Sequence, residues 1–433
     1  MMSSFKPDQI AGMGLLLATL LVPAASAALS TCKAARTPTD LHGALIVANP
    51  PATVTALDPP IAGQPLYGRD DHGHLPIGFN DGAIQGGLAE APTVARITSD
   101  MNGVLVRENF QWNQAEATSG CYQWDTYDGY YHFFVAHGVR PIWVLWGTPR
   151  WANLVKCIQQ PLGAACLYPP DNSHIANYAA MAAAIAKRYP LSAGIEVWNE
   201  PNLSHYWHDP DPAVYDHLLT ATYDAVKAAN PAMRVLGGVL SVSSSTCMRV
   251  NLPTCSGYAP QAFLGDMLAD PAYGGEILQK MDALSLHPYP VIPADREGLN
   301  NFFAPMFVQI AEVLGADAST VRLVVDELGL SLKAGLPEEA QCTTLVTHFN
   351  QLDQADPRIA LSGQVDAVLF DVDVEGGDGY GFGTISSTTS LYTYTPRRVY
   401  REFRAALTGP AAPAWEDCAT SDTTPQTYPK PGG

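Results

Sequence analysis

Basic residues are scarce in this sequence: 24 Lys and Arg stand against 42 Asp and Glu, giving a formal net charge of -18 at pH 7. No run of basic residues interrupts this acidity. Such a chain repels the phosphates of nucleic acids and anionic membranes, so we expect no nucleic-acid partner. A neutral polysaccharide suits the composition better, although an acidic surface that keeps an exported protein soluble would give the same balance.

Long apolar runs are also missing, apart from one near the N-terminus. Lys6 precedes an apolar stretch centred on Gly12 to Val22, and Ala25-Ser26-Ala27 follows it. This order is typical of a secretory signal, so we predict a signal peptide over residues 1–27 and a secreted product, extracellular or periplasmic. A membrane anchor is the alternative, but a spanning helix needs about 20 apolar residues. We expect no membrane insertion after signal removal, and a monomer.

The usual motifs for metals and nucleotides are missing as well. There is no Cys-x-x-Cys, no cluster of Cys and His, and no Gly-rich loop between a predicted strand and helix. We therefore predict no metal site and no organic cofactor.

What the sequence does contain is an even number of cysteines, eight in all, which in an exported chain indicates disulfides. Two pairs would close short loops: Cys157 with Cys166, and Cys247 with Cys255. The other four could pair as Cys32–Cys121 and Cys342–Cys418, which would tie the chain ends to the body; the sequence leaves this pairing open.

Short apolar runs alternate with helical patterns from about Leu75 onward. The predicted strands are Pro76–Asn80, Gly103–Asn109, Pro141–Trp146, Ala193–Glu200, Met233–Val239, Ala283–Tyr289, Arg322–Gly329 and Val365–Val372. The predicted helices are Thr93–Met101, Trp124–His137, His174–Tyr189, Pro212–Ala229, Pro260–Leu268, Asn301–Leu314, Pro337–Gln354 and Pro396–Leu407.

This alternation predicts an α/β fold, a single (β/α)8 TIM barrel with disulfide-pinned loops. A doubly wound sheet is the rival, but no Gly-rich loop suggests its nucleotide site. We place the signal at 1–27, an irregular segment at 28–74, the barrel at 75–409 and a tail at 410–433 that is predicted to be disordered apart from Cys418.

Carboxylates close two of the predicted strands. Glu200 lies in Val197-Trp198-Asn199-Glu200-Pro201-Asn202, and Glu327 ends the run from Val321 to Glu327. Polar groups at the end of a buried strand need partners, and barrel enzymes carry their catalytic groups there. Two strand-end carboxylates, one a proton donor and one ionised, are what glycoside cleavage requires, and strands four and seven face each other across a barrel.

Several segments also resemble the clan of (β/α)8 retaining glycosidases that includes families 5, 10 and 39, with family 39 nearest. The resemblance covers about Leu75 to Leu407 and implies Glu200 as acid/base and Glu327 as nucleophile. It further implies that Asn199 holds the sugar 2-hydroxyl and that Arg107 keeps the nucleophile ionised. His287 and Tyr289 match the strand-six pair whose Tyr hydrogen-bonds the nucleophile.

Simpler structural roles compete with each assignment. Glu200 could be a structural carboxylate, Glu327 a salt-bridge partner with Asp326 as nucleophile, and Arg107 an ordinary ion pair. His287 and Tyr289 could cap a strand in a rigid loop.

Aromatic side chains are the remaining candidates for substrate contacts. Trp146, Trp151 and Trp207 could be sugar platforms or could pack in the core, and Trp198 is expected to pack between the barrel and a helix.

Two departures from the clan stand out. Strand eight offers no Trp to floor the first subsite, only Asp371, Asp373 and Glu375, which would bind hydroxyls or line an acidic rim. Asp326 stands where Thr or Ser is commoner, and strand alternation predicts that it points away from Glu327.

From these observations we expect a secreted retaining hydrolase of a β-linked poly- or oligosaccharide. A carbohydrate-binding barrel without turnover and a transglycosylase are the alternatives.

Overall fold

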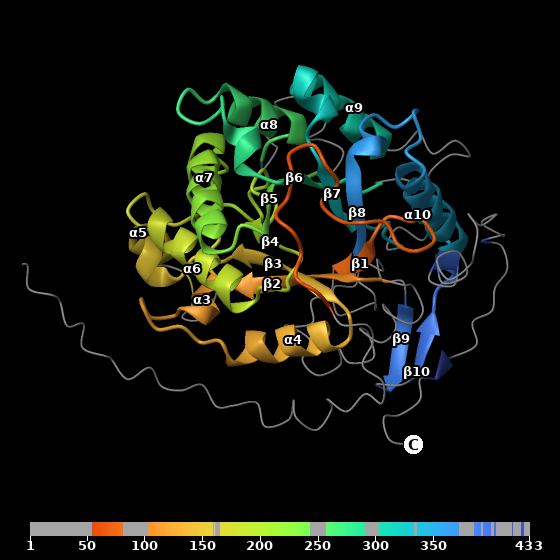
Figure 1. Ribbon diagram of the computed structural model, residues 1–433, viewed down its shortest axis with the longest axis horizontal. Helices are drawn as coiled ribbons and strands as arrows, with labels where there is room; N and C mark the ends of the chain where they lie inside the picture. The colour runs from red at the N-terminus through yellow and green to blue at the C-terminus, as the bar shows by residue number, and fades with distance from the viewer. Residues whose placement is uncertain are drawn as a thin grey trace, which may run out of the picture. The chain divides into compact units, whose positions relative to one another are not determined.

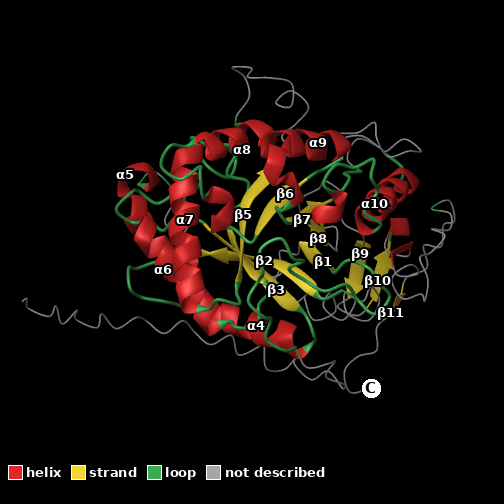
Figure 2. Cartoon of the chain, turned by 45° about the horizontal axis from the view of Figure 1, so that its top comes forward, coloured by secondary structure: helices red, strands yellow, loops and turns green. Residues whose placement is uncertain are grey.

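The computed structural model describes residues 54–80, 103–158, 160, 165–242, 257–290, 303–332, 336–371, 385–390, 393–399, 402–403, 418 and 426–427. Eight parallel strands close into a barrel in the order β1 to β8, with β8 paired to β1. Helices surround the strands (Figures 1 and 2). The predicted (β/α)8 fold is confirmed.

The barrel strands are β1 Ile77–Asn80, β2 Leu105–Gln111, β3 Arg140–Trp146, β4 Gly194–Val197, β5 Arg234–Ser241, β6 Ala283–His287, β7 Leu323–Leu328 and β8 Val365–Asp371. The helices are α3 Trp112–Ala115, α4 Asp125–Ala136, α5 Leu154–Cys157, α6 Ile175–Arg188, α7 Pro212–Ala229, α8 Pro260–Ala269, α9 Phe303–Leu314 and α10 Glu338–Asp353. A small antiparallel sheet follows, made of β9 Ile385–Ser390, β10 Thr393–Pro396 and β11 Gln426–Thr427.

All eight predicted strands are present, and six predicted helices lie within about two residues of the observed α4 and α6–α10. The helix predicted over Thr93–Met101 lies outside the described residues, and that over Pro396–Leu407 lies largely outside them. The strand predicted to run to Glu200 ends at Val197 instead, because the backbone of Trp198 turns to a φ of 69°. None of the helices in the described parts of the chain has the length and apolarity of a membrane span.

Side chains fill the barrel interior in layers, one apolar and the next charged. The lower layer is apolar and includes Leu105, Ile142, Leu236 and Val324. Because side chains alternate along a strand, the interior positions two residues further on carry the next layer. On β2 and β4 these are Arg107 and Glu196, so a charged layer lies directly above an apolar floor.

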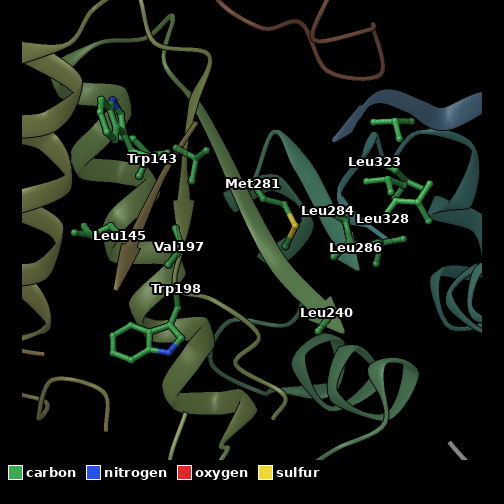
Figure 3. Packing of buried hydrophobic residues seen from close by; sticks show 14 of the residues in the cluster. Trp143, Leu145, Val197, Trp198, Leu240, Met281, Leu284, Leu286, Leu323 and Leu328 are labelled. Atoms are coloured by element: carbon green, nitrogen blue, oxygen red, sulfur yellow. The ribbon is translucent and has the colours of Figure 1, made fainter. Parts of the chain in front are cut away.

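The outward strand faces bind the helices through apolar residues. Trp143 and Leu145 of β3 and Val197 of β4 are buried there, and Leu284 and Leu286 of β6 continue the layer (Figure 3). This packing holds the strand ends in place, since truncating one buried side chain of this size lowers the stability of a protein by about 2–5 kcal/mol.

The irregular segment before β1 covers the lower end of the barrel. Tyr67 joins the apolar layer, and its hydroxyl donates to the carbonyl of Ala193 at 3.2 Å. Arg234 donates to the Leu66 carbonyl at 2.9 Å, and Asp366 accepts from the Leu66 amide at 2.9 Å. The mouth at the other end is where the catalytic groups of barrel enzymes lie.

The predicted disulfide Cys157–Cys166 is confirmed, with Cα atoms 5.6 Å apart. Of the pairings that the sequence leaves open, the structure contains Cys342–Cys418, with Cα atoms 5.9 Å apart. Cys121 is also disulfide-bonded. The predicted Cys247–Cys255 pair and Cys32 lie outside the described residues.

Candidate active site

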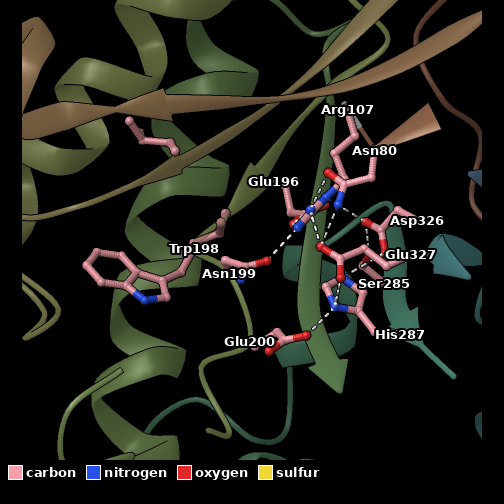
Figure 4. Close-up of polar contacts among 12 residues, drawn as sticks. Asn80, Arg107, Glu196, Trp198, Asn199, Glu200, Ser285, His287, Asp326 and Glu327 are labelled. Carbon is pink, nitrogen blue, oxygen red and sulfur yellow. Dashed lines mark hydrogen bonds and ion pairs between the residues drawn. The ribbon is translucent and has the colours of Figure 1, made fainter. Parts of the chain in front are cut away.

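The exit from β4 places two polar residues side by side at the mouth. Trp198 would face the interior if the strand continued, but its left-handed backbone turns the indole outward, where it is fully buried against Trp207. Asn199 and Glu200 follow, and Glu200 also has a positive φ of 43° (Figure 4). Such backbone conformations cost of order 1–3 kcal/mol and cluster at functional sites.

The end of β7 also brings two neighbouring polar residues, Asp326 and Glu327, into the barrel interior, here through a shift in strand register. The pairing of β7 with β8 shifts register between Val325 and Leu328. The expectation that Asp326 points away from Glu327 is therefore wrong: both carboxylates contact Arg107 and His287 inside the barrel. Extra residues in a ladder interrupt the alternation, which allows neighbours to share one face.

Arg107 joins the charged layer to the mouth. Its Nε donates to both carboxylate oxygens of Glu196 at 3.1 Å, and Nη2 donates to the same group and to Asn199 Oδ1 at 2.6 Å. Nη1 donates to Glu327 Oε1 at 2.5 Å. Burial disfavours the cation, but Glu196, Glu327 and Asp326 outweigh that and hold the pKa of Arg107 well above its usual value.

Glu327 receives donors on both oxygens. Besides Arg107, Asn80 Nδ2 lies 3.1 Å from Oε1, and the Tyr289 hydroxyl donates to Oε2 at 2.6 Å. Glu327 is 8% exposed, whereas Asp326 is fully buried. Glu327 is thus the one of the two carboxylates that keeps some exposed surface and accepts hydrogen bonds on both oxygens.

His287 lies between the carboxylates of β4 and β7. Its Nδ1 is 2.7 Å from Glu200 Oε1 and 3.3 Å from Glu327 Oε2. Its Nε2 is 3.2 Å from Asp326 Oδ1. One carboxylate oxygen of Glu200 and one of Glu327 lie within 4.8 Å of each other around this ring.

Asp326 and Glu196 form a hydrogen-bonded carboxyl pair in the charged layer. Burial raises the pKa of Glu196 well above its usual value, and the nearby Asp326 adds to this against the pull of Arg107. Burial also acts to raise the pKa of Asp326, but hydrogen bonds from Glu196 and His287 outweigh it and lower that pKa. The two pKa shifts thus run in opposite directions, upward for Glu196 and downward for Asp326.

Asp371 ends β8, where the clan usually has Trp. Its Oδ1 accepts from Asn80 Nδ2 at 2.9 Å, and Tyr289 also hydrogen-bonds it. Burial and the neighbouring Glu327 raise the pKa of Asp371 to about 7. Asp373 and Glu375 lie outside the described residues.

Of the three predicted aromatic platforms, one is wrong. Trp207 is fully buried and packs edge-on against Trp198 and Tyr215, so it offers no face to a ligand. Trp146 ends β3 and is partly buried. Trp151 is partly buried and donates to the Glu116 carbonyl at 2.9 Å. Both keep some exposed surface, and their contact with a sugar stays a prediction.

Three residues of the site escaped sequence reasoning: Asn80, Glu196 and Ser285. Asn80 bridges Glu327 and Asp371 and accepts from Arg107 at 3.0 Å. It ends a strand just as Glu327 does, so the same signal could have found it. Glu196 is a charged residue in an otherwise apolar strand, and this pattern in the sequence could also have indicated a functional residue. Ser285 Oγ donates to Asp326 Oδ2, and a lone Ser on a strand gives no such warning.

Two residue sets have the spacing of metal ligands: Glu196, His287 and Asp326, and Glu200, His287 and Glu327. Both share His287, and Arg107 contacts a carboxylate in each. A bound cation would therefore face the guanidinium, and we assign these residues to no metal.

No family model matches the sequence, and no curated protein matches it either. Solved structures do match. A family 39 glycoside hydrolase from the gut symbiont Bacteroides cellulosilyticus WH2 is similar at 18% identity and a TM-score of 0.55, over 78% of this chain and 64% of that one. The chain therefore spans just under two thirds of that enzyme's length.

A monomeric beta-xylosidase from Caulobacter crescentus CB15 is similar at 16% identity and a TM-score of 0.54, over 81% of this chain and 69% of that one. A bacterial orthologue of human α-L-iduronidase matches at 13% identity and a TM-score of 0.51, over 81% and 57% of the two chains. The family that the sequence motifs resemble thus recurs among the structural matches, and this chain has the (β/α)8 fold of those glycoside hydrolases.

Proposed function

We propose that this protein is a secreted, retaining glycoside hydrolase that acts on a β-linked oligo- or polysaccharide. The observation that carries the proposal is the pair formed by Glu200 and Glu327, whose oxygens lie within 4.8 Å of each other at the barrel mouth. Retaining enzymes hold their two carboxyl groups about 5–5.5 Å apart, and inverting enzymes about 6.5–9.5 Å. The spacing of Glu200 and Glu327 therefore supports a mechanism that retains the anomeric configuration. The glycosidase fold and the exported character predicted from residues 1–27 agree with this role.

In the first step, Glu327 attacks the anomeric carbon and the glycosidic C–O bond breaks. Arg107, Asn80 and Tyr289 already donate to Glu327, which orients its carboxylate for the attack. Glu200 gives its proton to the departing oxygen. In the second step Glu200 takes a proton from water, the water oxygen attacks the same carbon, and Glu327 leaves as a carboxylate.

Asn199 fits a role in holding the sugar. Its Oδ1 accepts from Arg107 at 2.6 Å, which fixes the amide and leaves its NH₂ group to donate to a ligand. Arg107 donates to both Asn199 and Glu327, which supports a role for Asn199 near the proposed nucleophile. A hydrogen bond to the 2-hydroxyl that strengthens in the transition state would contribute several kcal/mol.

The test is a panel of β-configured aryl glycosides and soluble β-glycans assayed with the mature protein. We expect Glu327→Ala to lower turnover by roughly 10⁴-fold or more. Azide should restore it by filling the space of the missing carboxylate, giving a glycosyl azide of inverted configuration. The exposed Glu276→Gln on the outside of the barrel is the control and should keep wild-type activity.

Rescue of Asp326→Ala instead of Glu327→Ala would reassign the nucleophile. Binding of glycans without turnover would favour the non-catalytic binder, and sugar-acceptor products in place of hydrolysis would indicate a transglycosylase.

A further inference from the structure

His287 has a carboxylate at each of its nitrogens. Nδ1 faces Glu200 and Glu327, and Nε2 faces Asp326 at 3.2 Å. The ring is fully buried, and among the described residues neither Nε2 nor Asp326 Oδ1 has a hydrogen-bond partner apart from this contact with each other. The two atoms therefore form a buried ion pair.

This arrangement constrains the protons on the ring. A neutral imidazole has one bare nitrogen, whose lone pair would face Asp326 Oδ1 at Nε2 or Glu327 Oε2, 3.3 Å away, at Nδ1. Only the imidazolium presents an N–H to both sides. Burial opposes the charge, but Glu327, Asp326 and Glu200 outweigh it and hold the pKa of His287 well above its ordinary value.

We propose that Asp326 is a positioning residue that keeps His287 doubly protonated, so that Nδ1 donates to Oε1 of Glu200 and the transferable proton of Glu200 stays on Oε2. The inference rests on the proposed acid/base role of Glu200. Asp326 is fully buried, so it acts on the reaction only through the residues that it contacts; Figure 4 shows it beside Glu327.

Asp326 is itself held for this task. Ser285 Oγ donates to its Oδ2, Arg107 Nε lies 3.7 Å away, and the Glu196 carboxyl donates to it. These donors stabilise the anion, so it can serve as the fixed counter-charge of His287. A Thr or Ser at this position would lack the negative charge.

The proton balance at the ring follows from the groups around it. The titratable and charged groups near His287 are Glu196 and Glu200 on or after β4, Asp326 and Glu327 on β7, Tyr289 after β6, Tyr206 after β4, Arg107 on β2 and Asp371 on β8. Arg107 and His287 are the cations of this group, and Asp326 is the carboxylate that faces Nε2 at 3.2 Å. Removing the Asp326 charge leaves the ring one counter-charge short.

The first measurement is the ¹⁵N spectrum of the His287 ring in the wild-type protein from pH 5 to pH 8, assigned by its loss in His287→Gln. We expect both nitrogens to be protonated throughout. A ring that titrates near the usual value of about 6.5, or that lacks a proton on Nε2, overturns the proposal. This measurement uses the wild-type protein, so it requires neither substrate turnover nor a substitution among the buried charges.

The second measurement uses Asp326→Asn. We expect the ring to become neutral about one pH unit or more lower than in the wild type, since an opposite charge at this range stabilises a cation by that amount. A neutral ring accepts at Nδ1 and draws the Glu200 proton onto Oε1. The basic limb of kcat/KM should then move to lower pH.

At pH 7 this should cost about 10-fold or more for substrates with poor leaving groups and less than about 3-fold for activated aryl glycosides. Asp371→Asn is the matched control, because it removes a neighbouring buried carboxylate that has no ion pair to the ring, and it should leave the ring doubly protonated. An Asp326→Asn protein with unchanged ring spectra and pH profiles overturns the proposal. Absence of turnover in every variant, with the expected spectra, would overturn only the proposed function.

Discussion

At the scale of single residues, Arg107 determines how the site is built. One planar guanidinium donates to Glu196 below it and to Asn199 and Glu327 above it. A lysine ammonium has no fork that could reach three groups in different directions. The arginine also compensates for burying several carboxylates in a small volume, since each would otherwise carry an uncompensated desolvation cost.

A different buried carboxylate has no such compensation. Asp216 on α7 is fully buried, and neither of its oxygens has a hydrogen-bond partner among the described residues. Burial, with Asp270 and Asp211 adding repulsion, raises the pKa of Asp216 to about 8. The folded state therefore holds a proton that the unfolded state releases near pH 4.

Because the folded pKa is the higher one, the stabilising contribution of Asp216 is complete below pH 4 and is lost as the pH rises to about 8. We expect Asp216→Asn to raise the free energy of unfolding by roughly 2–4 kcal/mol at pH 8 and to change it little at pH 4. Urea unfolding at both pH values measures this. Asp266→Asn, the same change at an exposed site on α8, should have no effect. An equal effect of Asp216→Asn at both pH values would contradict a titration.

At the scale of elements, regular patterns were predictable from the sequence and irregular ones were not. The apolar runs of β1 to β8 and the helical spacing of α6 and α7 follow from periods of 2 and 3.6 residues. The turn at Trp198 and the register shift in β7 break those periods. Glu200 and Glu327 were found by residue type at a strand end, but the inward position of Asp326 and the outward position of Trp198 depend on backbone geometry that alternation does not encode.

The contact of β1 with β2 provides a test of an element's packing. A Cβ added to Gly78 of β1 would lie 2.1 Å from the backbone oxygen of Leu105 on β2. Backbone cannot yield as a flexible side chain can, so the two strands would have to separate. We expect Gly78→Ala to cost about 2–4 kcal/mol of stability, near the upper end for overpacking.

Thermal unfolding of Gly78→Ala measures that cost, and activity should fall with it because Asn80 lies at the end of the same strand. Gly68→Ala is the control, since no atom lies within 4 Å of an added Cβ there. A Gly78→Ala protein as stable as Gly68→Ala would show that the strands do not approach as closely as described.

At the scale of the whole molecule, barrel closure is what assembles the site. Asn80 on β1 and Asp371 on β8 are almost 300 residues apart, yet they share a hydrogen bond because these strands pair. No local pattern in the sequence could place them together; only the closed order of eight strands does. The same closure explains why sequence reasoning named Asp371 on β8 as a candidate but missed its partner Asn80 on β1.

The disulfide Cys342–Cys418 ties residues near the end of the chain to α10, which lies beside the last barrel strand in Figure 1. It spans 76 residues, against 9 for Cys157–Cys166. A cross-link limits the unfolded chain more when it closes a longer loop, and the chain-entropy relation gives about 4–5 kcal/mol for the long loop and about 2–3 kcal/mol for the short one. We therefore expect the double variant Cys342→Ala with Cys418→Ala to unfold at lower urea concentration than Cys157→Ala with Cys166→Ala. Cys157, Cys166 and Cys342 are buried and Cys418 is partly buried, so loss of side-chain volume does not favour the variant of the long loop as the less stable one. A larger loss from the short loop would mean that the disulfides act through native contacts at the mouth and not through the unfolded chain.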